Sequence, residues 1–310
     1  MARKVLLATE KPFAKTAREE LSQILKQAGY EVVLLESYKD KAQLLAAVAD
    51  VEAMIIRSDI VDKEVLGAAK ALKLVVRAGA GYDNIDCAAA KEKGVAAMNT
   101  PGQNSNAVAE LALGLMVYMA RCKFNGKSGF ELKGKRLGVH GIGAVGKLVA
   151  TIGKGFGMTV KAYDPFLKPE QIKEAGAEPV KSLEDLYSGS DYLSLHIPAN
   201  KDTKKTIGFK LLNLMPKGAT LVNTARAEVI DEAGLLEALE KRPDLKYASD
   251  VEPTAPTAEA IKAKYGERVY WTPKKMGAQT EEANVNSGLA AARQIVGFFE
   301  KGDKKFIVNP

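Results

Sequence analysis

The chain has 310 residues, 46% of them apolar and 27% charged, and its two cysteines are too few for a disulfide framework. This length suffices for two domains, and no apolar run approaches the roughly 20 residues of a membrane span. The net charge of +7 comes from lysines interspersed with Glu and Asp, without the basic runs and aromatics of a nucleic-acid surface. We therefore expect a globular, cytoplasmic protein that binds small anions, with no membrane, nucleic-acid or metal partner.

Short apolar runs alternate with amphipathic stretches from the N-terminus onward. Helices are expected to begin near residues 14, 41 and 63. Strands are expected at 4–8, 31–35, 53–56, 72–76 and 95–98. This alternation predicts a parallel sheet with helices on both faces.

A long apolar helix is predicted from Asn104 to Arg121, followed by a polar, glycine-rich linker or exposed arm at 122–135. A second alternating series runs from Lys135 to about Trp271. A final helix, Thr280 to Glu300, is expected to lead to a short strand at 305–309. Two series separated by a long helix favour two domains over one large α/β domain.

The strongest local motif is "LGVHGIGAVGK", which places Gly141, Gly143 and Gly146 between a strand and a helix. In such a loop the glycines permit a tight turn, close approach of the backbone to a pyrophosphate, and close helix–strand packing. Asp164 ends the next strand, where its carboxylate can accept hydrogen bonds from ribose hydroxyls and repel a 2′-phosphate. The motif predicts NAD rather than NADP.

Two further stretches suit an anion. "RAGAGYDNID" contains Ala80 and Gly81, whose backbone N–H groups can form a nest for a carboxylate, although a tight turn without a ligand explains the stretch equally well. "IIRSD" puts Arg57 and Ser58 at a strand end, where the arginine suits phosphate or carboxylate. A surface ion pair is the alternative for Arg57.

Taken together, these motifs resemble the D-2-hydroxyacid dehydrogenase family, and within it the short-form phosphoglycerate enzymes. "MNTPGQNSNAVAELALGLM", "SLHIP", "LMPKGATLVNTARAEVIDEAGLLEAL" and "SDVEPTAP" extend the resemblance over nearly the whole chain. It implies two doubly wound parallel-sheet (Rossmann-like) domains with an active-site cleft between them. Residues 1–99 and 284–310 would bind substrate and 100–283 NAD. It also implies no serine-sensing domain after Pro310.

The resemblance assigns roles residue by residue. Arg226 would hold the substrate carboxylate and polarise the carbonyl, as a fixed guanidinium can. Arg57 and Ser58 would bind a phosphate, and Ala80 and Gly81 would form the backbone nest. The implied cofactor contacts, beyond the three loop glycines and Asp164, are Ala144, Val145, Ile197, Thr224, Ala225, Asp250, Gly277 and Ala278.

The family's catalytic pair, a histidine after "TP" and a glutamate, is absent. The glutamate position is Ala255, with Glu252 three residues earlier, and "TPKKMGAQTEEA" has lysines where the histidine is expected. The only histidines, His140 and His196, belong to two predicted strands. A lysine could transfer the proton, solvent could supply it, or the protein could bind NAD without turnover.

Counting along the motif from its two ends gives Lys274 or Lys275, and we favour Lys275; both could instead only attract an anion. A buried lysine beside Arg226 would have a lowered pKa and could serve as general acid and base. The resemblance implies oxidation of D-3-phosphoglycerate with NAD in serine synthesis by a homodimer formed through the long helix and arm. The alternatives are another D-2-hydroxy acid or an NAD-sensing binding protein.

Overall fold

A computed structural model describes residues 2–310, and the chain divides into two compact units. The first unit comprises Met1–Asn104 and Thr280–Pro310, and the second comprises Ser105–Gln279. The units divide at 104/105 and 279/280, which is five and four residues away from the boundaries expected at 99/100 and 283/284. The first unit is thus discontinuous in sequence, whereas the second is a single segment.

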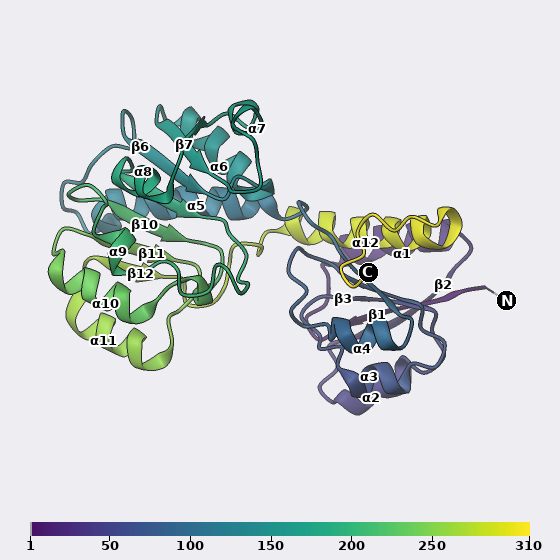
Figure 1. The fold of residues 1–310 in the computed structure, drawn as a ribbon. Helices are drawn as coiled ribbons and strands as arrows, with labels where there is room; N and C mark the ends of the chain where they lie inside the picture. Colours follow the sequence, from purple (N-terminus) through teal and green to yellow (C-terminus); the bar gives the residue numbers. More distant parts are fainter. Residues whose placement is uncertain (1) are drawn as a thin grey trace. The chain divides into compact units, whose positions relative to one another are not determined.

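The first unit contains one parallel sheet with the strand order β2–β1–β3–β4–β5 (Figure 1). Its strands are β1 (Lys4–Thr9), β2 (Glu31–Glu36), β3 (Ala53–Ile56), β4 (Leu74–Arg77) and β5 (Ala96–Asn99). Its helices are α1 (Lys15–Gln27), α2 (Lys41–Ala47), α3 (Lys63–Ala68), α4 (Cys87–Glu92) and α12 (Glu281–Lys301).

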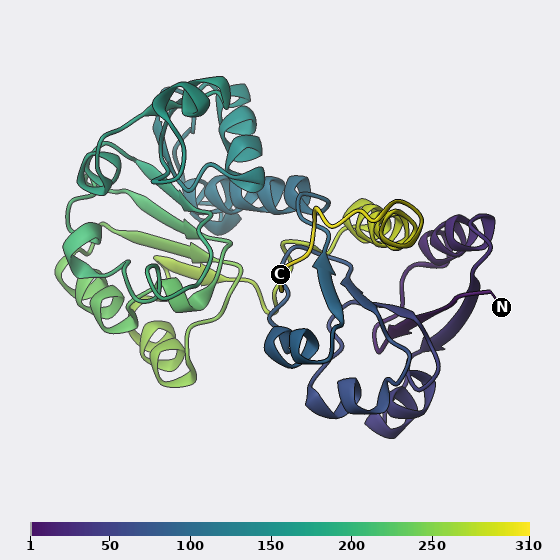
Figure 2. The ribbon, with the colours of Figure 1, turned by 45° about the vertical axis from the view of Figure 1, so that its right-hand side comes forward.

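Except for the edge strand β2, which is only partly buried, the strands of this sheet are buried on both faces, because their side chains alternate between two helical layers. In β1, Leu6 packs with α2, α3 and α4, whereas Leu7 packs with α1 and α12. In Figures 1 and 2 α1 and α12 lie side by side on one face of the sheet, with the other helices on the opposite face. This is the predicted doubly wound arrangement.

The helix α12 begins and ends at favourable capping residues. The side chain of Thr280 accepts a hydrogen bond from the N–H of Ala283, and Gly302 ends the helix with φ 65°. The strand predicted at 305–309 is wrong: only an isolated antiparallel bridge joins Met98 to Ile307. The segment is held to β5 by one backbone hydrogen bond, from the N–H of Val308 to the carbonyl of Ala97, and by the Asn309 side chain, which accepts from the N–H of Ala97.

The second unit contains a seven-stranded parallel sheet with the order β12–β11–β10–β9–β6–β7–β8. Its strands are β6 (Arg136–His140), β7 (Thr159–Tyr163), β8 (Glu178–Pro179), β9 (Tyr192–Leu195), β10 (Thr220–Asn223), β11 (Lys246–Ser249) and β12 (Val269–Trp271). Its helices are α5 (Ser105–Ala120), α6 (Ala144–Gly155), α7 (Pro169–Glu174), α8 (Leu183–Ser188), α9 (Phe209–Leu212), α10 (Glu232–Lys241) and α11 (Ala255–Tyr265), with short turns η1 (Cys122–Phe124) and η2 (Ala227–Val229). The strand order reverses between β6 and β9, and in open α/β sheets ligands bind outside the strand ends at such a point.

The segment after α5 leaves regular structure, as predicted for residues 122–135. It starts with three consecutive residues in the left-handed region, Cys122, Lys123 and Phe124, with φ between 52° and 57°. The Lys123 amine donates to the carbonyls of Gly266 and Val269, which holds this strained turn in place.

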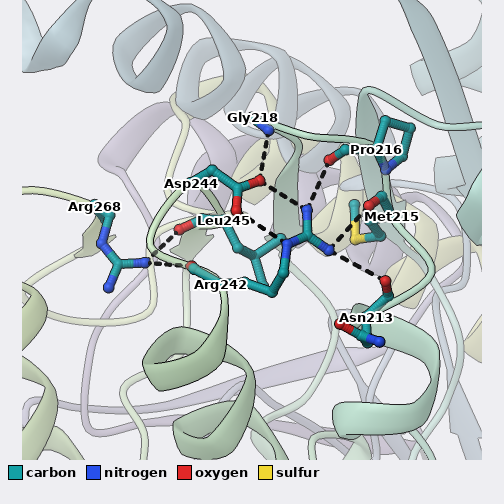
Figure 3. Close-up of polar contacts among 8 residues, drawn as sticks. All are labelled: Asn213, Met215, Pro216, Gly218, Arg242, Asp244, Leu245 and Arg268. Atoms are coloured by element: carbon teal, nitrogen blue, oxygen red, sulfur yellow. Dashed lines mark hydrogen bonds and ion pairs between the residues drawn. The ribbon is translucent and has the colours of Figure 1, made fainter.

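An ion pair closes the loop that leads into β10 (Figure 3). Arg242 makes five hydrogen bonds, two of them to Asp244, whose carboxylate also accepts from the N–H of Gly218. The remaining acceptors are the carbonyls of Asn213, Met215 and Pro216. The hydrogen bond from Arg242 holds the pKa of Asp244 well below its ordinary value. The entrance to β10 is therefore fixed, and its far end carries candidate site residues.

Across residues 2–310, no helix combines the length and the apolar character that crossing a membrane requires.

Candidate active site

The glycine loop after β6 has the shape that a dinucleotide site needs. Gly141 has φ 87°, and a Cβ there would lie 2.9 Å from the carbonyl oxygen of His196. A Cβ at Gly146 would lie 2.2 Å from the carbonyl oxygen of Gly141, so α6 can approach the turn only with glycine at this position. A Cβ at Gly143 would meet no described atom within 4 Å, which leaves the space in front of the helix open.

The N-terminus of α6 is available to an anion. Its N-cap is Gly143, which offers no side-chain acceptor, so the first N–H groups of the helix, including those of Ala144 and Val145, have no capping oxygen. A helix N-terminus with free N–H groups favours a phosphate. These residues therefore fit the pyrophosphate of NAD.

Asp164 follows β7 and is tied to the same loop. Its carboxylate accepts hydrogen bonds of 3.0 Å from the N–H groups of Ile142 and Phe166. The carboxylate is thereby held beside the glycine turn, and it keeps acceptor capacity for a ribose hydroxyl.

The neighbouring strands bring two more predicted residues to this edge of the sheet. Ile197 follows β9, and its side chain lies 3.0 Å from the Cβ position of Gly141, which puts it next to the glycine turn. Thr224 follows β10; it is buried, and its hydroxyl oxygen has no hydrogen-bond partner among residues 2–310. A buried hydroxyl without a partner is costly, and a bound cofactor or substrate would supply one.

Arg226 is positioned through its backbone. The Asn223 side chain accepts from the N–H of Ala225 and donates to the carbonyl of Arg226, at 3.0 and 2.9 Å. Asn223 is fully buried at the end of β10, and the Arg226 guanidinium donates to the carbonyl of Ala225. Asn223 was not predicted as a site residue, although it lies in the quoted stretch "LMPKGATLVNTARAEVIDEAGLLEAL".

The lysine-bearing loop follows β12. Lys274 and Lys275 are both exposed, so the burial that we expected around a catalytic amine is not present. Asp250, by contrast, is 1% exposed and accepts hydrogen bonds from Thr272, Met276 and Gly277. Ala278 is partly buried directly after this loop.

Glu252 is engaged away from these lysines. It accepts from the Trp271 indole and from Lys262, both at 3.2 Å. Ala255, at the glutamate position of the family pattern, is the first residue of α11. The two histidines are also engaged elsewhere: His140 lies beside Tyr187, and the Nε2 atom of His196 lies 2.8 Å from the hydroxyl of Ser194.

In the first unit, Arg57 follows β3 and is not paired with a carboxylate. Its guanidinium donates to the carbonyls of Lys11 and Pro12 and to the side-chain oxygen of Asn284. It also lies over the Phe13 ring, 5.2 Å from the centroid. Burial lowers its pKa from the ordinary value. Sequence reasoning missed Asn284, because the contact joins residues 227 positions apart.

The predicted nest follows β4 in the same unit. The Asn99 side chain donates to the carbonyl of Ala80 at 2.5 Å, whereas the N–H groups of Ala80 and Gly81 have no acceptor within residues 2–310. The guanidinium of Arg77 occupies the space beside Gly79. Ser58 is exposed after β3. Arg77 opens the quoted stretch "RAGAGYDNID", but no role was predicted for it.

Comparison with known proteins agrees with this geometry. Residues 115–274 match the family model described as "D-isomer specific 2-hydroxyacid dehydrogenase, NAD binding domain". The chain is similar to a solved structure of NAD⁺-bound 3-phosphoglycerate dehydrogenase from Entamoeba histolytica, with 44% identity, a TM-score of 0.91, and coverage of 100% of this chain and 99% of that one.

Two curated relatives share one value of sequence identity with this chain, 36%. D-3-phosphoglycerate dehydrogenase of Methanocaldococcus jannaschii is 36% identical over 89% of this chain, which spans only 55% of that protein. Hydroxypyruvate reductase of Thermotoga maritima is 36% identical over 86% of this chain and 90% of that protein. The second unit is thus an NAD-binding domain, and the chain belongs to the D-isomer-specific 2-hydroxyacid dehydrogenase family.

Proposed function

We propose that the protein oxidises D-3-phosphoglycerate to 3-phosphohydroxypyruvate with NAD, as the entry step of serine synthesis. The observation that supports a phosphorylated substrate is the set of hydrogen bonds that the Arg57 side chain makes. Its three hydrogen bonds go to neutral oxygens, so no carboxylate is bonded to the guanidinium and further N–H donors remain for an anion. The names of relatives such as the Methanocaldococcus jannaschii protein support this substrate.

In the proposed reaction the chain's own residues bind, orient and move a proton. Arg57 and Ser58 bind the phosphate, and Ala80 and Gly81 offer backbone N–H groups to the carboxylate. Arg226 holds the carboxylate and stabilises negative charge on the C2 oxygen. When bound, NAD accepts the hydride that leaves C2.

The proton of the C2 hydroxyl passes to a lysine, for which we propose Lys275. In oxidation its neutral amine takes the proton, and in reduction its ammonium returns it. The glycine loop, the N–H groups of Ala144 and Val145, and Asp164 hold the dinucleotide. Ile197, Thr224, Ala225, Asp250, Gly277 and Ala278 are proposed to contact it as well.

The test is NADH formation with D-3-phosphoglycerate against D-glycerate, D-lactate and D-2-hydroxyglutarate. We expect the highest kcat/KM with D-3-phosphoglycerate. Arg57→Ala should raise its KM roughly 10- to 100-fold, because a charge-assisted hydrogen bond is lost, and should leave the KM of D-glycerate unchanged. Arg18→Ala is the matched control, since Arg18 is already paired with Glu36 at 2.7 Å.

Equal or better turnover of an unphosphorylated acid contradicts the substrate assignment. It would favour the second candidate, a dehydrogenase for another D-2-hydroxy acid, to which the similarity to the Thermotoga maritima hydroxypyruvate reductase points. NADH binding without turnover of any of these acids would favour an NAD-sensing binding protein, the candidate that the missing histidine keeps open.

We also propose that the protein is a homodimer formed through α5 and the arm that follows it. Phe124 and Phe130 on this arm are 66% and 63% exposed. Exposed apolar side chains on one segment favour an interface.

A further inference from the structure

The loop that carries the two lysines is anchored at one buried carboxylate. Asp250 lies directly after β11 and is 1% exposed. Its Oδ1 atom accepts from the Thr272 hydroxyl at 2.8 Å and from the N–H of Met276 at 2.7 Å, and its Oδ2 atom accepts from the N–H of Gly277 at 2.7 Å. The anchor points therefore stand on both sides of Lys274 and Lys275.

The donors to this carboxylate are all neutral, so burial of its charge is compensated only by these hydrogen bonds. Thr272 is itself buried, with 4% exposure. A Cβ at Gly277 would lie 2.9 Å from the Oδ2 atom of Asp250, which leaves no room for a side chain there. The loop therefore lies close against the Asp250 carboxylate at Thr272, Met276 and Gly277. It cannot shift without losing several hydrogen bonds at once.

We infer that Asp250 is a positioning residue that fixes the backbone of the lysine loop. In a catalytic pair of histidine and glutamate, the carboxylate orients the side chain of the base directly. Here Glu252 is engaged by Trp271 and Lys262, and the Asp250 carboxylate bonds the loop on both sides of the two lysines rather than the side chain of the base. This inference rests on the proposed catalytic role of Lys275 for its effect on rate, but not for the existence of the anchor.

Three substitutions separate the anchor from other roles. Asp250→Asn keeps the shape but replaces one acceptor oxygen by an NH₂ group that faces a donor. Thr272→Val removes only the hydroxyl donor, whereas Thr272→Ser keeps it. The matched control is Asp59→Asn, because Asp59 is a carboxylate of 2% exposure in the other unit that likewise accepts three hydrogen bonds, from Glu10, Tyr38 and Arg57.

The first measurement is amide hydrogen exchange of the peptide covering 272–279. We expect exchange about tenfold faster in Asp250→Asn and Thr272→Val, because each loses part of the anchor, and exchange like wild type in Thr272→Ser and in Asp59→Asn. Unchanged exchange in Asp250→Asn overturns the anchor. Faster exchange of this peptide in Asp59→Asn as well would also overturn it, since the effect would then be general destabilisation.

The second measurement is steady-state kinetics. We expect kcat to fall about 10- to 100-fold in Thr272→Val with little change in NADH affinity, because a small displacement of a catalytic group has a cost of this size, and Thr272→Ser to restore it. Faster exchange with wild-type kcat in Thr272→Val overturns the positioning role. If the wild-type protein turns over no 2-hydroxy acid, the proposed function fails, while the exchange experiment still decides whether the anchor exists.

Discussion

Lys274 and Lys275 are adjacent, exposed and carried by one loop, so they form a matched pair for substitution. Lys275→Ala should lower kcat about 10²- to 10⁴-fold, the usual effect of removing a general acid or base, with NADH affinity near that of wild type. Lys274→Ala should mainly raise KM, because that lysine then acts only by attracting the anionic substrate. Steady-state kinetics and NADH fluorescence titration measure both effects.

Wild-type kcat in Lys275→Ala would remove that residue from the mechanism and make Lys274 the next candidate. Wild-type kcat in both variants would leave solvent as the proton source. Lys275→His should not restore activity, because position 255 is an alanine at the start of α11 and no carboxylate there can orient an imidazole.

At this scale the sequence predicted which residues reach each strand end, but not how they are held. Arg57 was predicted from the local motif "IIRSD", and Arg226 and Asp250 from the family resemblance. Their partners Thr272, Asn223 and Asn284 were not, because a hydrogen bond between distant segments leaves no periodic or compositional pattern. The expected burial of the lysine proposed as acid and base was wrong for a related reason: a two-lysine stretch carries no information about what covers it.

At the scale of elements, two strands of the nucleotide sheet lead to histidines, of which His140 is buried and His196 is half-buried. His140 is the last residue of β6, and His196 directly follows β9. Burial lowers the pKa of His140 to about 4 and that of His196 to about 3. Both rings are therefore neutral in the folded protein, whereas in the unfolded chain they bind protons below about pH 6.5.

Because the unfolded state binds more protons, the free energy of unfolding should decrease as the pH falls from about 6.5 towards 4. The expected loss by pH 5 is about 2 kcal/mol for each histidine. Urea unfolding at pH 7.5 and pH 5 measures it, and His140→Phe should show about half of the wild-type decrease. Equal free energies at the two pH values in the wild-type protein would contradict the assignment.

The elements themselves were largely predictable. Strands such as β3 and β4 are continuous apolar runs between polar helices, as fully buried parallel strands are. The strand expected at 305–309 was wrong, because an apolar run of this length is equally compatible with an extended segment held by one bridge and an asparagine side chain. Periodicity cannot distinguish the two.

At the scale of the whole molecule, the proposed homodimer makes a direct prediction. Wild-type protein at micromolar concentration should sediment with the mass of two chains. Phe124→Glu with Phe130→Glu should shift the mass toward one chain, because charges would then be buried in the interface. Phe166→Glu is the control, since Phe166 is 88% exposed but lies outside the arm. A wild-type mass of one chain would refute the dimer.

The discontinuity of the first unit has a consequence for how the protein is made. The chain leaves this unit after Asn104 and returns to it at Thr280, and α12 then adds Ala291, Ala292 and Ile295 to the core on one face of the sheet. During synthesis on the ribosome, that face of the N-terminal sheet stays only partly covered until Ser105–Gln279 and then α12 have been translated. The second unit can fold meanwhile, so cotranslational folding should run out of chain order, with the N-terminal sheet as the segment most in need of chaperone protection.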